Sequence, residues 1–171
     1  MREEDRKGAK SVSVIERIDG ELHSVKTFFD EAGNVIEHSV NPLMLEFQLK
    51  DVCQILVGAA VLSIPSAYTE EVWVLGEKLP LPNMIGVIIA SLTFVGMFGY
   101  FIFYKDHFRG YQWELTKRVV FVYLITFVVS AMILCLLQKL PMMSDPLTAL
   151  NRTVLVAFPG CFSGTVVDSL K

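Results

Sequence analysis

The sequence predicts an all-α membrane domain of four transmembrane helices, preceded by a small N-terminal β-rich extension. Two observations lead to this fold class. More than half of the 171 residues are hydrophobic and only 19% are charged, which is unlike a typical soluble domain. The apolar residues also gather into four long segments in the later part of the chain, whereas the early part has short runs typical of strands.

The N-terminal extension, residues 1–42, is predicted to form a three-stranded antiparallel meander. Asp19–Gly20 separates two strand-like runs, and this pair favours a type I′ hairpin turn because both positions require positive φ. The turn predicts the pairing: Val14 opposite Val25, and Val12 opposite Thr27. A second turn at residues 30–34 leads to a strand at 35–40. Such a sheet buries too little core to be stable alone, so we expect it to lie against the membrane domain, a partner or its own copies.

The membrane domain, residues 43–171, contains four segments that are each predicted to cross the bilayer. A helix needs about 20 apolar residues to cross about 30 Å of hydrocarbon. The predicted spans are residues 52–75, 84–104, 119–137 and 153–170. The fourth is the shortest and contains glycine.

Charge distribution predicts the orientation of the protein in a cell membrane. The loop between the second and third spans is the most basic one, with Lys105, Arg109, Lys117 and Arg118. The positive-inside bias places this loop in the cytoplasm, and four spans then place both termini there too. Residues 1–51 carry 7 Lys/Arg and 11 Asp/Glu, a net charge of −4 that argues against nucleic acid as a partner.

The first predicted span carries the strongest candidate for an ion or proton site. Pro65 has no N–H to donate to the carbonyl four residues earlier, so it should kink or loosen the helix there. Ser63, Ser66 and Glu70 share one face of a helix, and Glu71 lies on a neighbouring face. Carboxylates beside a loosened backbone are what a cation or proton site requires.

The alternative is that these carboxylates simply lie among the lipid headgroups. Glu70 would then be solvated and would pair with Lys78 or Arg152. In that case Tyr68 and Trp73 would be ordinary aromatic anchors at the membrane interface. The sequence favours this alternative for Glu70 and leaves both interpretations open for Glu71. If Glu71 forms an ion or proton site, Tyr68 and Ser66 would support it.

The fourth span carries a packing motif and one further carboxylate. Gly160 and Gly164 form a GxxxG pair, which lets two helix backbones approach closely within one subunit or between copies. Asp168 would either line an inner vestibule or lie at the inner interface near Lys171.

No motif of an enzyme is present, so no catalytic residue and no cofactor are predicted. The three cysteines lie in apolar segments without a CxxC or a His/Cys cluster, and whether a metal binds stays open. The chain also lacks a Ser/His/Asp set, an HExxH motif and a phosphate-binding glycine loop.

Two short motifs are similar to an uncharacterised family of small prokaryotic integral membrane proteins. The first is Pro65-x-x-Tyr68-Thr69-x-Glu71-x-Trp73, and the second is the ending Pro159…Gly164…Asp168-Ser169. The resemblance covers about Leu49 to Lys171 and implies a membrane fold. It implies no activity, but it favours Glu71 over Glu70 as the acidic position.

The leading hypothesis is an oligomeric channel or transporter that conducts ions or protons. Four helices enclose little room for a pathway, and the close-packing glycines favour a homo-oligomer. The rival is a non-catalytic membrane anchor or sensor whose N-terminal extension binds a partner. In both cases the protein is embedded in the lipid bilayer.

Overall fold

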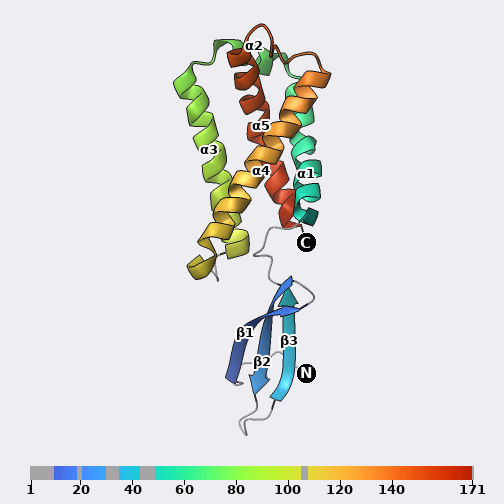
Figure 1. The fold of residues 1–171 in the computed structure, drawn as a ribbon, viewed down its shortest axis with the longest axis vertical. Helices are drawn as coiled ribbons and strands as arrows, with labels where there is room; N and C mark the ends of the chain where they lie inside the picture. Colours follow the sequence, from blue (N-terminus) through green and yellow to red (C-terminus); the bar gives the residue numbers. More distant parts are fainter. Residues whose placement is uncertain (1–9, 19–20, 30–34, 43–48, 105–107, 171) are drawn as a thin grey trace. The chain divides into compact units, whose positions relative to one another are not determined.

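The computed structural model of the chain describes residues 10–18, 21–29, 35–42, 49–104 and 108–170 (Figure 1). The chain divides into two compact units, Met1–Glu46 and Phe47–Lys171. The strands lie in the first unit and the helices in the second.

The described part of the N-terminal unit is an antiparallel sheet in the order β1-β2-β3. The strands are β1 (Lys10–Ile18), β2 (Glu21–Phe29) and β3 (Val35–Pro42). The predicted pairing is confirmed, since Val14 lies opposite Val25 and Val12 lies opposite Thr27. Val40 faces Val25 from the other side, so three valines form a row across the sheet. Rows of β-branched side chains of this kind stabilise strand pairing.

The two predicted turns, Asp19–Gly20 and residues 30–34, lie outside the described residues. The strands on either side of them are described, and their antiparallel order is the one that two such turns would produce. The pairing of β2 with β3 shifts between Phe28 and Phe29, which the sequence did not predict.

Among the described residues, four helical segments are long and apolar enough to cross a bilayer. The helices are α1 (Leu49–Ala67), α3 (Leu81–Gly99), α4 (Phe108–Leu136) and α5 (Pro146–Ser169). α3 continues directly into a π-helix, η2 (Tyr100–Tyr104), so the second candidate span is Leu81–Tyr104. A short helix, α2 (Glu70–Lys78), comes between α1 and α3 in the chain.

The first span ends earlier than the predicted range of 52–75, because α1 stops at Ala67. Pro65 cannot donate to the carbonyl four residues before it, and the Tyr68 N–H closes the helix by bonding to the Pro65 carbonyl at 3.2 Å. The Trp73 indole then donates to the Ala67 carbonyl at 2.8 Å. This bond satisfies one of the carbonyls left open at a helix end.

The third and fourth spans both begin earlier than predicted. α4 starts at Phe108 rather than near Val119, and α5 starts at Pro146 rather than near Thr153. The start of α5 follows from Asp145, which accepts a bond from the Thr148 N–H at 3.1 Å, and from proline at the first helical position. The sequence contained this signal, but the apolar run alone placed the boundary later.

α5 is the central helix of the bundle and packs against α1, α2, α3 and α4 (Figure 1). Its close approach to α1 depends on small residues. A Cβ added at Gly160 would overlap the Ser63 hydroxyl of α1 and lie 3.3 Å from the Ala59 carbonyl, and one at Gly58 would lie 2.9 Å from the Ser163 carbonyl of α5. Gly164 also lies against α1, with Ile55 3.5 Å from such a Cβ. The glycine pair thus packs helices within one chain.

Candidate functional site

One end of the helical unit contains a buried cluster of charged side chains. Arg118 of α4 donates from Nη2 to Asp51 Oδ2 of α1 at 2.9 Å, and its Nε lies 3.5 Å from Asp168 Oδ2 of α5. The exposed fractions are 0% for Asp51, 2% for Arg118 and 0% for Asp168. Three candidate spans therefore each contribute one charge to a site that is closed to solvent.

The start of α1 and the end of α5 lie at the same end of the bundle, so their carboxylates come together. Asp51 lies in the first turn of α1, and Asp168 lies in the last turn of α5. A carboxylate is favoured at a helix N-terminus by the helix dipole and disfavoured at a C-terminus. Arg118 offsets the second, unfavourable placement, so Asp168 depends more on the guanidinium than Asp51 does.

The π-helix supplies the aromatic part of the cluster. The Cζ atom of Arg118 lies 4.0 Å from the centre of the Phe103 ring, a cation–π contact. Tyr104, the last residue of η2, is fully buried. π-helices are rare and occur often at functional sites, where the extra residue redirects side chains.

Burying these charges costs free energy of folding. Taking charges out of water costs several kcal/mol per ion in real proteins, and the mutual attraction of a buried pair often only offsets that cost. A buried ion pair is therefore weak evidence for a stabilising role. Within membrane spans, ionisable side chains are rare and commonly mark ion or proton pathways.

A second polar layer lies deeper in the bundle. Ser63 of α1 and Ser130 of α4 share a hydrogen bond of 3.1 Å, and the Ser63 hydroxyl lies 3.5 Å from the Val156 carbonyl of α5. Both serines are fully buried. On each of the three helices this layer is 12 residues from the charge cluster, which is about 18 Å at 1.5 Å per residue.

Apolar side chains separate these polar layers. One buried cluster consists of Ile55, Val122 and Cys161, which lie between the two polar layers along α1, α4 and α5, together with Val95 of α3. Another consists of Ala67, Leu134 and Val156. In the described residues the interior of a single chain thus alternates between polar and apolar layers.

The opposite end of the bundle holds a second arginine in a different environment. Arg152 of α5 donates to the carbonyl of Trp73 at 3.2 Å, to the carbonyl of Lys139 at 2.7 Å and to Glu77 Oε1 at 2.5 Å. The side chain of Arg152 is 10% exposed and that of Glu77 is 57% exposed. The Lys139 ammonium lies 4.2 Å from the centre of the Trp73 ring.

Asn151 completes this second end by binding the end of α2. Its Nδ2 donates to the carbonyls of Gly76 at 3.0 Å and Leu79 at 3.1 Å. These two carbonyls lie at the end of α2, where a helix leaves its last carbonyls open. Gly76 is required here, because a Cβ at this position would lie 2.5 Å from Arg152 Cγ.

Residues 23–167 match a protein family described as "Putative integral membrane protein (DUF2391)". The chain belongs to this family. The resemblance inferred from the two motifs is therefore confirmed, but the family match begins within β2 and not at about Leu49. No curated protein and no solved structure matches the chain.

Membership in DUF2391 establishes an integral membrane protein and leaves its activity open. Asp51 and Arg118 lie inside the matched residues, and Asp168 follows directly after the last of them. Part of the N-terminal sheet is also matched, so β2 and β3 belong to what the family shares and are not an unrelated extension.

The carboxylates favoured by the sequence lie far from the charge cluster. Glu70 and Glu71 are exposed in the first turn of α2, where they line a shallow hollow with Val74, Leu75 and Lys78. Tyr68 is exposed, Ser66 is half-buried, and Trp73 is half-buried against Lys139. Asp168 lies at the other end of α5 from Arg152, the residue that contacts α2.

Sequence reasoning missed Asp51 and Arg118. Both were assigned to the flanks of the spans, since the first span was predicted to begin at Val52 and the third at Val119. The helices in fact extend beyond the apolar runs and carry the charges inside the bundle. One feature of the sequence could have identified them. Asp51 and Arg118 each directly adjoin an apolar run, and both runs were predicted to begin on the same side of the membrane. Among the described residues, no three His, Cys, Asp or Glu side chains gather as metal ligands would.

Proposed function

We propose that this protein moves protons or small cations across the membrane and that Asp51, Arg118 and Asp168 form its charged site. The observation that carries the proposal is the complete burial of both carboxylates against one guanidinium, with a different span providing each group. Carboxylates within membrane spans are the groups by which pumps and transporters commonly handle protons and cations.

The geometry supports coupling between the bound charge and the arrangement of the spans. Protonating a carboxylate, or screening it with a cation, weakens its attraction to Arg118. Since α1, α4 and α5 are joined through this cluster, a change at one carboxylate alters the contact among three helices. Such a site acts as a switch between two packings.

The apolar layers limit where protons or cations could cross the protein. The clusters around Ile55 and Leu134 fill the interior of one chain on either side of the buried serines. Passage therefore requires either that the helices move apart or that a path forms between copies in a homo-oligomer. Glu71, exposed on α2, would then line the outer mouth of such an assembly.

The proposed orientation places the charge cluster at the cytoplasmic face, with both termini. Lys117 and Arg118 of α4 belong to the most basic stretch between two spans, which in the sequence also includes Lys105 and Arg109, and the positive-inside bias assigns that stretch to the cytoplasm. No catalytic role and no cofactor form part of the proposal.

Flux in proteoliposomes tests the proposal. Wild-type protein would be compared with Asp168→Asn and Glu71→Gln under proton, sodium, potassium and calcium gradients. We expect flux of one species that Asp168→Asn abolishes or re-selects. Glu77→Gln serves as the matched control, because it removes an exposed carboxylate that also pairs with an arginine. Absence of flux from folded wild-type protein under every gradient would contradict the proposal.

A membrane anchor or sensor is the second candidate, and the N-terminal sheet favours it. Val14 and Val40, which belong to the row of valines across the sheet, are 56% and 49% exposed. An exposed apolar row on a small sheet suits a protein partner. Deleting residues 1–42 separates the two functions: flux that survives the deletion supports transport by the helical unit, whereas loss of a signalling output without any flux supports a sensor.

A further inference from the structure

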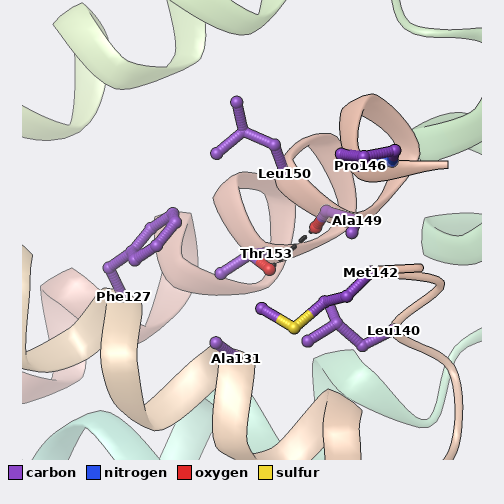
Figure 2. Close-up of a pocket in the computed structure, with 8 residues that line it drawn as sticks. All are labelled: Phe127, Ala131, Leu140, Met142, Pro146, Ala149, Leu150 and Thr153. Atoms are coloured by element: carbon purple, nitrogen blue, oxygen red, sulfur yellow. Dashed lines mark hydrogen bonds between the residues drawn. The ribbon is translucent and has the colours of Figure 1, made fainter.

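A cavity of about 280 Å³ lies between α4, α5 and the loop that joins them (Figure 2). Phe127 and Ala131 of α4 form one wall, and α5 forms the other. The remaining lining residues are Leu140 and Met142 of the loop and Pro146, Ala149, Leu150 and Thr153 of α5. The cavity belongs to neither of the two arginine sites.

The side chains that line the cavity are almost all apolar, and the one polar side chain among them is hydrogen-bonded within α5. Thr153 is the one lining residue with a polar side chain, and its hydroxyl donates to the Ala149 carbonyl at 2.8 Å, as Figure 2 shows. The hydroxyl proton is therefore used within α5, and only the lone pairs of this one oxygen are left to a water molecule, which needs two to four polar partners. An apolar cavity of about 150 Å³ stays dry and takes up benzene-sized ligands, and this one is larger.

We propose that the cavity binds one acyl chain of a membrane phospholipid. Its two walls are candidate membrane spans, so the molecules that reach it from the side are lipids. From Pro146 to Thr153 it follows α5 for about 10 Å, which runs from the helix start into the span. This is the direction in which an acyl chain passes from the interface toward the bilayer centre.

The bound chain contacts a segment that is tied to the Arg152 end. Leu140 lines the cavity and also packs against the Ala67–Leu134–Val156 cluster, as does Trp73. The preceding residue, Lys139, accepts the bond from Arg152. A chain in the cavity therefore presses on the loop that Arg152 holds, and Trp73 shares a packing cluster with Leu140 of that loop, so its emission is the readout.

Fluorescence quenching of Trp73 by brominated acyl chains tests the proposal. The chain has two tryptophans, so the background variant is Trp113→Phe, which leaves Trp73 as the sole emitter. Each protein would be reconstituted into vesicles of phosphatidylcholine with either ordinary or dibrominated acyl chains, and the ratio of the two emissions would be measured. Ala131→Phe fills the cavity, and Val128→Phe adds the same ring to α4 at a position that is exposed outside it.

We expect brominated chains to quench Trp73 in the background protein and in Val128→Phe, and Ala131→Phe to lose that quenching. Ala149→Leu fills the cavity from α5 and provides the same test if Ala131→Phe fails to fold. Equal quenching in filled and unfilled proteins would overturn the proposal, since bulk lipid alone would then reach Trp73. Quenching that appears only after dilution to monomers would also overturn it, because a second copy would be the occupant.

Discussion

Arg118 and Arg152 are both largely buried arginines at opposite ends of the same bundle, but they bind different kinds of oxygen. Arg118 pairs with two fully buried carboxylates. Arg152 binds two backbone carbonyls and a largely exposed carboxylate. Carbonyl oxygens do not titrate, so two of the three Arg152 bonds persist at any pH. The Arg118 end instead depends on the protonation of the groups around it.

This difference in bonding partners indicates a structural role for Arg152 and makes Arg118 the functional candidate. At the Arg152 end two of the three bonds go to backbone carbonyls, one in α2 and one in the loop after α4. At the Arg118 end, well-packed apolar residues would hold α1, α4 and α5 together at less cost. The expense of the second arrangement is what indicates a role beyond folding.

The largest effect is expected from Arg118→Met, which leaves Asp51 and Asp168 buried without the guanidinium. Breaking a buried pair by removing one partner costs about 3–5 kcal/mol. Unfolding in detergent, followed by circular dichroism, measures the loss. Adding Asp51→Asn and Asp168→Asn to the variant should recover much of it. A triple variant no more stable than Arg118→Met would refute the electrostatic explanation.

A smaller loss is expected from Arg152→Met at the other end. The substitution removes bonds to the carbonyls of Trp73 and Lys139, and an unsatisfied buried polar group costs about 1–3 kcal/mol. The loss should change little between pH 5 and pH 8, because two of the three bonds that are removed go to carbonyls, which do not titrate. The same unfolding assay at the two pH values checks this, and a loss that changes strongly with pH would remove the distinction between the two ends.

Gly76→Ala should disturb the Arg152 end without removing any polar group. Its new methyl group would lie 2.5 Å from Arg152 Cγ, and overpacking of this kind costs about 1–3 kcal/mol. Gly86→Ala is the matched control, since nothing lies within 4 Å of the position of its Cβ. Thermal unfolding should show a lower Tm for the first variant only. Similar shifts for both would mean that Gly76 has only a general helix effect.

The smallest effect concerns Asp145, the residue that starts α5. The hydrogen bond from the Thr148 hydroxyl, followed by that from its backbone N–H, lowers the pKa of Asp145 below its ordinary value. A lowered pKa in the folded protein means that this carboxylate stabilises the fold at neutral pH and that the contribution is lost as pH falls through the folded pKa. Asp145→Asn should therefore reduce the fall in Tm between pH 5 and pH 3. An unchanged fall would assign acid sensitivity to other carboxylates.

The parts of the fold that depend on local pattern were predictable. Four apolar runs gave four spans, and an Asp–Gly pair gave the strand pairing of Val14 with Val25. The end of α1 was harder, because it depends on Pro65 together with the bond from Trp73 to Ala67. The apolar pattern of the sequence continues past the end of α1, so hydropathy alone does not reveal where the helix ends.

The candidate site was predictable only in part, for a physical reason. Asp168 was recognised as a carboxylate at a span end, and its partners Asp51 and Arg118 were not. Their burial results from three helices that meet at one end of the bundle, and the residues are 50 to 117 positions apart in the chain. A charge beside an apolar run looks the same in sequence whether it faces water or another helix.

Infrared difference spectroscopy between pH 5 and pH 8 tests most directly whether the Arg118 cluster titrates. A protonated carboxyl in a water-poor site gives a C=O band that a solvated one does not share. We expect such a band in wild-type protein, its loss or shift in Asp51→Asn or Asp168→Asn, and no change in Glu77→Gln. A spectrum without this band in any protein would show that the cluster does not titrate and would make Arg118 a permanent clamp like Arg152.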